Sequence, residues 1–372
     1  RKGTVTVWIT EEETETFEVV QELYSPDPKD YYVKVSGSAD AGGLSWGDPL
    51  TLPAALKKAR LADRIHVAAG KYTPEVTIVN GNAADPKDNT FQFGACISLQ
   101  GGYPADAQDG AVADPTVNET ILSGAADGGI AYHVVVASAP RDFEYKVELK
   151  GVTISDGETA AKGSGVVSVG GSGIQRSYGG GIIVAGSEVH FEDCVIKNNK
   201  TNEHAGAGFI TGGANATFES CVIAGNSGLT TSSNCAGLYI EASTVIINNC
   251  TFSGNMTTGV AGALYVFHSS QPTYTYVYNT TFTGNHTNLA GTNKGRRGAA
   301  FYAREKSETV FVNCTFSGNT GGHGGAISAY GSASAPSKVD IISCTITGNL
   351  AETNGGDWKS PTGILRSTFT IP

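Results

Sequence analysis

"NNCTFSGNMT", residues Asn248–Thr257, decides the fold, because it is written again almost letter for letter as "VNCTFSGNTG" at Val312–Gly321. The well-defined copies of the pattern begin 27 to 34 residues apart. A recurring unit of this length indicates a repeat architecture, in which each unit forms one turn of an elongated structure. Further copies begin at Cys194, Cys221, Thr280 and Cys344, and weaker ones at Glu119 and Val152.

A second, glycine-rich motif precedes each copy, as in "GGGIIVAGS" (Gly179–Ser187) and "GGAISAYGS" (Gly324–Ser332). A short strand such as "VHFED" (Val189–Asp193) lies between the two motifs. Each repeat therefore offers three short strands, and none contains a segment long enough for a helical crossover. The sequence predicts an all-β solenoid with three short strands per coil. Each strand would pair in parallel with its copy in the next coil, about 4.8 Å away.

Strand alternation decides which side chains of the repeat face the interior. In the opening stretch, Cys250 and Phe252 point one way, and Thr251 and Ser253 point the other. The matching positions in the other repeats are compact and almost all apolar, as a solenoid interior requires. The predicted inward columns are Cys194, Cys221, Cys250, Thr280, Cys314 and Cys344; Ile196, Ile223, Phe252, Phe282, Phe316 and Ile346; Phe191, Phe218, Ile247, Val277, Phe311 and Ile341; and Ile182, Phe209, Leu238, Leu264, Ala300 and Ile327.

An asparagine ends every well-defined copy of the motif, directly after a glycine or another asparagine. This position indicates a turn, because asparagine accepts left-handed backbone and bonds neighbouring backbone groups. Stacked in every coil, the amides can also bond one another along the solenoid. Small residues would let the chain bend at the start of the next strand. The asparagines are Asn199, Asn226, Asn255, Asn285, Asn319 and Asn349, and the small residues are Gly181, Gly208, Gly237, Ala263, Ala299 and Ala326.

Residues 31–372 are predicted to form the solenoid, with about eight coils. Residues 1–30, with two strand-like runs around an acidic turn, are predicted to form a small separate β-segment. Thr51 can cap a helix that has Pro53 in its first turn. This N-terminal capping helix would close the open end of the core. Its apolar stripe consists of Leu52, Ala55, Leu56 and Ala59.

Composition and charge exclude several classes of partner. The formal net charge of -10 argues against nucleic acid and anionic membranes. No run of about 18 apolar residues is present to span a membrane. Five of the seven cysteines share one inward column, where we expect free thiols rather than disulfides. No paired cysteine or histidine motif suggests a metal, and no cofactor is expected.

The paired glycine-rich and Cys-Thr-Phe-Ser-Gly-Asn motifs resemble the repeats of polymorphic outer-membrane proteins. More broadly, they resemble the right-handed parallel β-helices of the pectin-lyase-like superfamily. The segments Tyr32–Pro74 and Phe93–Gly110 resemble the start of bacterial surface β-helices, often from Bacteroidetes. The resemblance implies a single-stranded right-handed parallel β-helix that is secreted or lies on the outer surface of a bacterial cell. It implies an adhesin-like monomer that binds a polysaccharide or a host surface protein.

Two other functions stay open. The first is an enzyme, a polysaccharide lyase or glycoside hydrolase acting on an acidic, plant or host polysaccharide. The resemblance implies clustered aspartates in the hydrolases, and calcium on acidic residues with an arginine base in the lyases. After Gly157 the chain offers only Asp193, Asp340 and Asp357, in distant coils, which argues against both. The second alternative is a passive structural stalk.

The best acid pair for catalysis is Glu192 and Glu219, which occupy the same column two residues before their cysteines on neighbouring coils. Adjacent coils would bring the two carboxyl groups near the roughly 5 Å spacing of retaining glycosidases. His190 and His204 are candidate neighbours of this pair. Two acids on a strand surface are equally what an ordinary solvated face contains.

A positive cluster surrounds Arg297, which is a candidate lyase base or a contact for an acidic glycan. With Glu305 and Glu308 beside it, the cluster also fits a solvated ion-pair patch. Its members are Lys294, Arg296, Arg297, Arg304 and Lys306.

Three aromatic residues, Tyr239, Tyr265 and Phe301, are the candidate ligand-binding residues. They are predicted to share the outward column of the glycine-rich strand on consecutive coils, and Tyr276 and Tyr278 are expected to join them. Aromatic faces in a row can stack on sugar rings or contact a protein. They can also stabilise parallel strands without any ligand.

Overall fold

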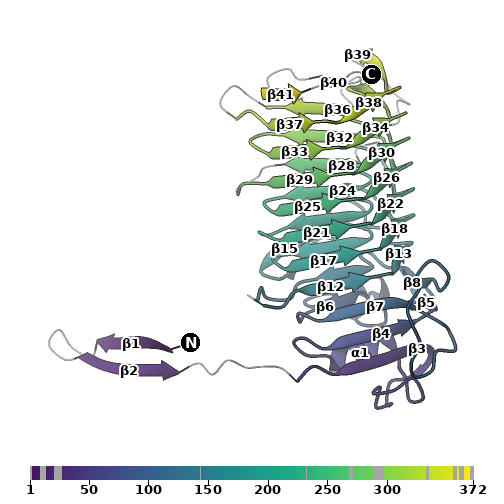
Figure 1. Ribbon diagram of the computed structural model, residues 1–372, viewed down its shortest axis with the longest axis vertical. Helices are drawn as coiled ribbons and strands as arrows, with labels where there is room; N and C mark the ends of the chain where they lie inside the picture. Colours follow the sequence, from purple (N-terminus) through teal and green to yellow (C-terminus); the bar gives the residue numbers. More distant parts are fainter. Residues whose placement is uncertain are drawn as a thin grey trace.

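The strands of the computed structural model wind into a parallel β-helix (Figure 1). The structure describes residues 27–142, 144–231, 233–267, 271–287, 297–331 and 335–351, and the strand backbones of residues 2–8, 14–20, 352–354, 358–359 and 364–368.

Three parallel sheets form the walls of the helix, and we name them the long, cysteine and glycine sheets. The long sheet contains β3 (Asp30–Ser38), β4 (Arg64–Ala68), β7 (Ser98–Tyr103), β12 (Val147–Lys150), β17 (Glu188–Glu192), β21 (Asn215–Glu219), β25 (Thr244–Asn248), β29 (Tyr274–Tyr278), β33 (Glu308–Val312), β37 (Lys338–Ile342) and β41 (Ile364–Thr368). The cysteine sheet contains β5 (Gly70–Tyr72), β8 (Thr120–Ser123), β13 (Thr153–Ser155), β18 (Val195–Lys197), β22 (Val222–Ala224), β26 (Thr251–Ser253), β30 (Thr281–Thr283), β34 (Thr315–Ser317) and β38 (Thr345–Thr347). The glycine sheet contains β6 (Phe91–Phe93), β11 (Val135–Ala137), β16 (Ile182–Ala185), β20 (Gly208–Thr211), β24 (Leu238–Glu241), β28 (Leu264–Phe267), β32 (Phe301–Arg304), β36 (Ile327–Tyr330) and β40 (Trp358–Lys359).

The prediction of three strands per coil is confirmed, and the described residues add a fourth, short sheet after the asparagine turn. It contains β19 (Lys200–Thr201), β23 (Ser227–Gly228), β27 (Met256–Thr257), β31 (His286–Thr287), β35 (Thr320–His323) and β39 (Leu350–Asn354). The long sheet has eleven strands among the described residues, so the solenoid is longer than the expected eight coils. The first coils escaped the count because their strands lack the cysteine motif.

The remaining helices and strands lie outside the four parallel sheets. The helix α1 (Leu52–Lys58) begins as predicted, with the Thr51 side chain accepting a hydrogen bond from the Ala54 amide. Leu52 and Ala55 of this helix are fully buried against the first coils, as a capping helix requires. The remaining elements are β1 (Lys2–Trp8) paired antiparallel with β2 (Thr14–Val20), β9 (Ala125–Ala126) with β10 (Gly129–Ile130), β14 (Val166–Val169) with β15 (Ser172–Gln175), and the 3-10 helix η1 (Pro86–Asp88). The division of the chain at residue 30 stays a prediction.

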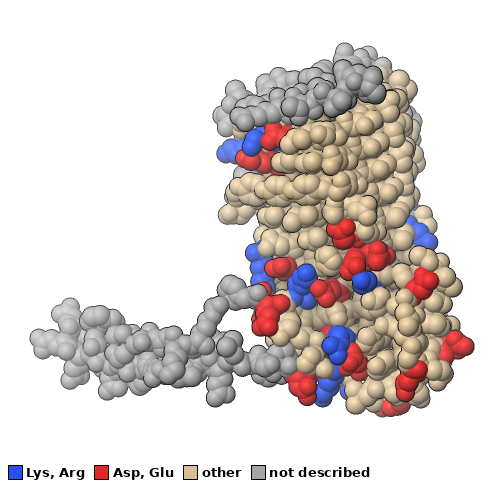
Figure 2. All heavy atoms as spheres, viewed as in Figure 1, with Lys and Arg blue, Asp and Glu red and all other residues tan. Residues whose placement is uncertain are grey.

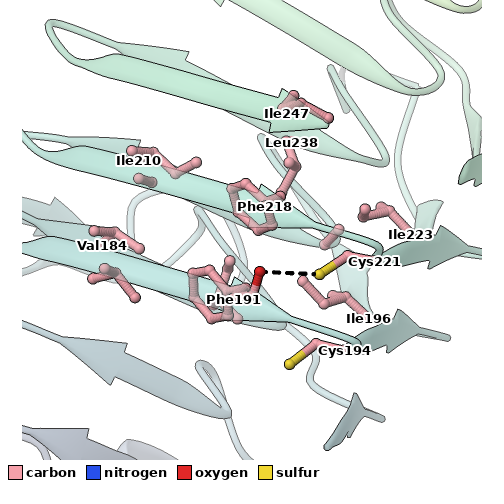
Figure 3. Close-up of a cluster of buried hydrophobic side chains, with 14 of the residues drawn as sticks. Val184, Phe191, Cys194, Ile196, Ile210, Phe218, Cys221, Ile223, Leu238 and Ile247 are labelled. Atoms are coloured by element: carbon pink, nitrogen blue, oxygen red, sulfur yellow. Dashed lines mark hydrogen bonds between the residues drawn. The ribbon is translucent and has the colours of Figure 1, made fainter. Parts of the chain in front are cut away.

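The interior is built from the columns that alternation predicts. Phe191 stacks on Phe218 with ring centroids 4.8 Å apart (Figure 3). Phe282 stacks on Phe316 at the same spacing. All seven cysteines are free and buried, and the Cys221 thiol donates a hydrogen bond to the Phe191 carbonyl at 3.5 Å. The thiol stack is therefore a packing element, since a buried free cysteine behaves as a small hydrophobe.

The asparagine column forms a continuous hydrogen-bonded ladder inside the turn. The Asn226 side-chain amide donates to the Asn255 side-chain oxygen at 2.9 Å and to the Ile196 carbonyl at 3.0 Å. The left-handed residue of the turn is the one before the ladder, such as Gly225 with φ 63° or Asn198 with φ 58°. Each ladder asparagine thus ties its own coil to the preceding coil and to the next one.

One predicted inward column is wrong by a single residue in two coils. Ile182 pairs with Gly208 rather than Phe209, and Leu264 pairs with Phe301 rather than Ala300. A one-residue slip moves a side chain to the opposite face of a sheet, so Phe209 points outward and Phe301 points inward. The small column shifts in the same way. It consists of Gly181, Ala207, Gly237, Ala263, Ala300 and Ala326.

Left-handed corner residues set this register. Ala205, with φ 63°, and Gly298, with φ 59°, stand three residues before the first inward position of their strands, Gly208 and Phe301. Several adjacent glycines and alanines in the motif make these corners indistinguishable by pattern alone.

Candidate functional site

The outer face of the long sheet carries two columns of chemically varied side chains. Strand pairing aligns them coil by coil from the N-terminal end upward. One column contains Tyr32, His66, Gln100, Lys150, Glu192, Glu219, Asn248, Tyr278 and Val312; the other contains Asp30, Arg64, Ser98, Glu148, His190, Thr217, Ile246, Tyr276, Val310 and Asp340.

Charged residues gather on the lower half of this face, and a second, smaller charged group lies near its upper end (Figure 2). The charges are largely paired within the sheet. Lys150 lies 2.6 Å from Glu192, and Lys146 lies 3.6 Å from Glu148. Each of these two lysines is thus neutralised by a glutamate beside it.

Glu192 and Glu219 lie side by side on adjacent strands, as predicted. Each carboxylate already has protein partners, since Glu192 pairs with Lys150 and both Glu219 oxygens accept from the Asn248 amide at 2.9 and 3.2 Å. His190 joins them, with Nε2 lying 3.8 Å from a Glu192 oxygen.

His204 does not belong to this group. Its ring contacts Tyr178 and Tyr239, with centroids 4.5 and 5.5 Å away, on the glycine-sheet side of the molecule. Burial lowers the pKa of His204 to about 4, so the imidazole is neutral at neutral pH.

A hollow of about 170 Å³ opens among the charged residues of the lower half. It is far smaller than the roughly 300–1,000 Å³ of pockets that enclose a whole drug-sized ligand. The hollow has room for one substituent or one ring of a larger chain. It is lined by Ser98, Leu99, Gln100, Lys146, Glu148, Leu149, Lys150, His190 and Glu192.

A compact aromatic cluster closes the N-terminal end of the face. Trp46, which is 3% exposed, packs on Tyr32 and Tyr103 with ring centroids 4.9 and 5.2 Å away. Tyr32 also stacks on His66 at 5.1 Å. The cluster forms a wall one coil below the hollow, because His66 pairs with Gln100.

The upper half of the face presents aromatic and aliphatic side chains to solvent. Tyr274, Tyr276 and Tyr278 alternate along β29 on its outward side. Tyr274 is 37% exposed and Ile246, beside Tyr276, is 40% exposed. Tyr276 and Tyr278 therefore belong to the long sheet, and the prediction that they join the glycine-sheet aromatics is wrong.

The predicted row of Tyr239, Tyr265 and Phe301 is corrected in two ways. Phe301 is fully buried in the main core, because Tyr302 rather than Phe301 occupies the outward position next to Tyr265. The true row is Phe209, Tyr239, Tyr265 and Tyr302, and its rings stack at 5.1, 4.7 and 5.2 Å.

The row is packed rather than open. Tyr239, Tyr265 and Tyr302 are each 5% exposed. Burial raises the pKa of the Tyr239 hydroxyl, as expected for a phenol held away from water. The row belongs to a second apolar cluster on the outside of the glycine sheet, which also contains Val167 and Ile174 from the β14–β15 hairpin. Its rings thus act as the structural stack that the sequence left open as an alternative.

Comparison with known proteins identifies the family. A family model described as a right handed beta helix region matches residues 76–282 and, in a second overlapping match, residues 144–360. The chain belongs to the right-handed β-helix family. The predicted fold class and handedness are thereby confirmed.

Two similar solved structures are named as a pectate lyase and a pectin methylesterase. The β-helix is similar to pectate lyase Pel9A, with 13% identity, coverage of 88% of this chain and 78% of that chain, and a TM-score of 0.51. It is also similar to a pectin methylesterase from carrot, with 15% identity, coverage of 91% and 90%, and a TM-score of 0.48. At 13% identity, the likeness to pectate lyase Pel9A shows the shared fold alone. No curated protein matches.

Arg297 of the β-helix lies away from the acid pair. Its guanidinium sits 4.6 Å from the Tyr330 ring centroid, at the end of the stacked row, and its Nη1 lies 3.5 Å from the Tyr302 hydroxyl. Arg304 lies over the Phe267 ring and pairs with Glu305 at 3.0 Å. The structure does not bring Arg297 together with Glu192. Lys294 and Arg296 lie outside the described residues.

Within the described part of the β-helix, no group of three or more His, Cys, Asp or Glu side chains is arranged to hold a metal ion. No helix among the described residues is long and apolar enough to cross a membrane.

Sequence reasoning missed the polar residues of the N-terminal wall. His66 alternates with the buried Ile65 and Val67, so its outward direction was readable from "RIHVA". Its partners Asp30 and Tyr103 come from other coils, 36 and 37 residues away. No repeat motif relates these three positions, because the first coils do not share the later pattern.

Proposed function

We propose that this β-helix binds a glycan chain through the outer face of the long sheet. The observation that carries the proposal is the set of three tyrosines alternating along β29, Tyr274, Tyr276 and Tyr278, on an exposed face. Side chains at alternate strand positions stand about 6.6–6.8 Å apart. Tyrosine offers an apolar ring for the hydrophobic face of a sugar and a hydroxyl for its polar edge.

The neighbouring coils supply groups suited to sugar hydroxyls. The Asn248 amide and the Glu219 carboxylate are hydrogen-bonded to each other directly below Tyr278 in the same column. Both side chains are partly exposed and retain unused hydrogen-bonding capacity. The aromatic strand, the amide–carboxylate pair and the hollow thus follow one another down a single face.

Catalysis by the acid pair receives less support. Hydrolysis needs one carboxyl group that donates a proton and one that acts as nucleophile or base. Glu192 is held by a lysine and Glu219 by an amide, so both carboxylates make the hydrogen bonds expected of ionised groups. The same contacts suit a surface that holds a sugar chain.

We place the protein outside a bacterial cell, secreted or on its outer surface, as an adhesin-like monomer. The resemblance of Tyr32–Pro74 to bacterial surface β-helices supports this location. The net charge of -10 supports a partner other than nucleic acid.

A panel of immobilised neutral and acidic polysaccharides tests the proposal. We expect retention on at least one glycan, and a loss of about 10-fold or more in affinity for the double variant Tyr276→Ala/Tyr278→Ala. The matched control is Tyr132→Ala, a partly buried tyrosine that bonds Asp85 away from the long sheet. Absence of retention on every glycan would favour a stalk, and retention only on protein-coated surfaces would favour a protein partner. Either outcome overturns glycan binding.

A further inference from the structure

A three-residue hydrogen-bond chain crosses the N-terminal wall of the face. Asp30 Oδ1 lies 2.7 Å from His66 Nε2, and the Tyr103 hydroxyl lies 2.8 Å from His66 Nδ1. This is the arrangement of a nucleophile, a base within hydrogen-bond reach, and an acid that orients the base. The repeat pattern of the solenoid does not account for this hydrogen-bond chain, because its three residues belong to different coils.

The acid of this chain is fixed and ionised. Arg64 donates two hydrogen bonds of 2.6 Å to Asp30, one to each carboxylate oxygen. Hydrogen bonding from Arg64, and then from His66, lowers the pKa of Asp30 to about 2 against the opposing effect of burial. An ionised Asp30 accepts a hydrogen bond from the Nε2–H group of His66, which leaves Nδ1 free to accept the Tyr103 hydroxyl proton.

Aromatic rings that pack on His66 and on Tyr103 hold the hydrogen-bond chain in place. Tyr32 stacks on the His66 ring with an angle of 25° between the planes, and Trp46 packs against Tyr103. The His66 side chain is 19% exposed, so the chain reaches solvent at its edge. Preorganised side chains of this kind meet the geometric requirement of a reactive site.

The Asp30–His66–Tyr103 hydrogen-bond chain lies next to the hollow. Arg64 pairs with Ser98 and His66 pairs with Gln100, and both partners line the hollow. The hollow's charges balance, with Lys146 and Lys150 set against Glu148 and Glu192. A balanced lining favours an uncharged group over a free carboxylate or amine.

We propose that Tyr103, His66 and Asp30 form an acyl-transfer site that acts on a small ester carried by a glycan. Tyr103 is the catalytic nucleophile. His66 accepts its proton, and Asp30 orients His66. The identity of the acyl carrier rests on the proposed function, but the chemistry of Tyr103 does not.

The reaction balances without a cofactor. The Tyr103 oxygen bonds to the ester carbonyl carbon while its proton moves to His66 Nδ1. The ester's C–O bond then breaks, and the departing alcohol oxygen takes that proton. Water attacks the acyl-tyrosine, gives a proton to His66, and releases the carboxylic acid as Tyr103 recovers its proton. Burial raises the pKa of Tyr103, so the hydroxyl stays protonated until His66 removes its proton.

The test uses the intact protein and p-nitrophenyl acetate, an activated ester that needs no glycan. We expect a burst of p-nitrophenol and an acetyl group mapped to Tyr103 by peptide mass spectrometry in the unmodified chain. Tyr103→Phe should abolish the burst, and His66→Asn should slow it about 100-fold or more. Tyr132→Phe, which removes a hydroxyl bonded to Asp85, should leave it unchanged.

Acetyl groups spread over surface residues, with Tyr103 labelled no faster than Tyr132, would overturn the proposal. A burst that survives Tyr103→Phe would overturn it as well. Mapping in the unmodified chain keeps the test valid even where a variant folds poorly. Since Tyr276 and Tyr278 take no part in this assay, its failure leaves glycan binding untouched, and lost retention on glycans leaves the acyl chemistry untouched.

Discussion

The glycine sheet and the long sheet both direct tyrosines outward, yet their surroundings differ. Tyr239 and Tyr265 on the glycine sheet are 5% exposed, whereas Tyr274 on the long sheet is 37% exposed. The first two follow one another along the solenoid axis and stack at 4.7 Å. Tyr274 and Tyr276 follow one another along a single strand, β29.

The direction of the aromatic series accounts for the difference. Coils repeat about every 4.8 Å, so rings in one column cover each other's faces. Alternate residues along a strand stand farther apart, at about 6.6–6.8 Å. The neighbours of Tyr276 on the adjacent coils are the aliphatic Ile246 and Val310. Rings stacked in a column along the solenoid axis therefore stabilise the fold. Rings spaced along one strand keep surface exposed that a ligand can contact.

Truncating a ring in the axial column should have the largest effect on stability. Tyr239→Ala removes a buried ring that stacks on two others, and we expect a loss of about 3–5 kcal/mol in the free energy of unfolding. Denaturant titration measures it, with Tyr276→Ala on the long sheet as the matched control, expected to cost less than about 1 kcal/mol. Equal losses for the two variants would erase the distinction between the faces.

The second-largest loss of stability is expected in acid, because two histidines are buried in the folded protein. Burial lowers the pKa of His133 and of His204 to about 4, below the roughly 6.5 of an unfolded histidine. Below pH 6.5 the unfolded chain binds protons that the folded chain excludes, so stability is full above 6.5 and falls toward pH 4. For His133, which is 2% exposed, the loss approaches about 3 kcal/mol.

The melting temperature measured between pH 7 and pH 4 checks this expectation. His133→Gln should flatten the acid-side decline by removing one of the two titrating groups. A decline identical to that of the unmodified protein would show that His133 does not contribute.

Tyrosine truncation on the open strand should affect binding instead of folding. Tyr278→Ala should weaken glycan retention about 10-fold, equivalent to about 1.4 kcal/mol, with little change in melting temperature. Tyr278→Phe keeps the ring and should retain most of the affinity. If the phenylalanine variant loses as much as the alanine variant, the hydroxyl rather than the ring makes the contact.

The smallest effect is expected at the acid pair. Glu219→Gln preserves an acceptor for the Asn248 amide, so stability should change by no more than about 0.5 kcal/mol and retention by less than about threefold. Complete loss of a measurable turnover in this variant would instead return Glu219 to the role of catalytic carboxylate.

The sequence predicted the repeated part of the fold well, because the positions of Cys250 and Phe252 recur in the same strand register from coil to coil. Phe301 was misplaced, since a one-residue ambiguity among small residues at a corner reverses the face. The sequence did not decide whether Tyr239 is buried. Strand periodicity shows toward which face a side chain points, but not whether another segment covers that face. The link between Asp30 and Tyr103 was invisible, since only the winding of the first coils brings them to the same histidine.

Tyrosine nitration, mapped residue by residue with and without a retained glycan, tests most directly whether the long sheet is the ligand face. If the long sheet is the ligand face, Tyr274, Tyr276 and Tyr278 are modified in the free protein and protected by the glycan. Tyr239 and Tyr265 are then unmodified in both states. Glycan-dependent protection of Tyr239 or Tyr265, with no change along β29, would contradict this expectation.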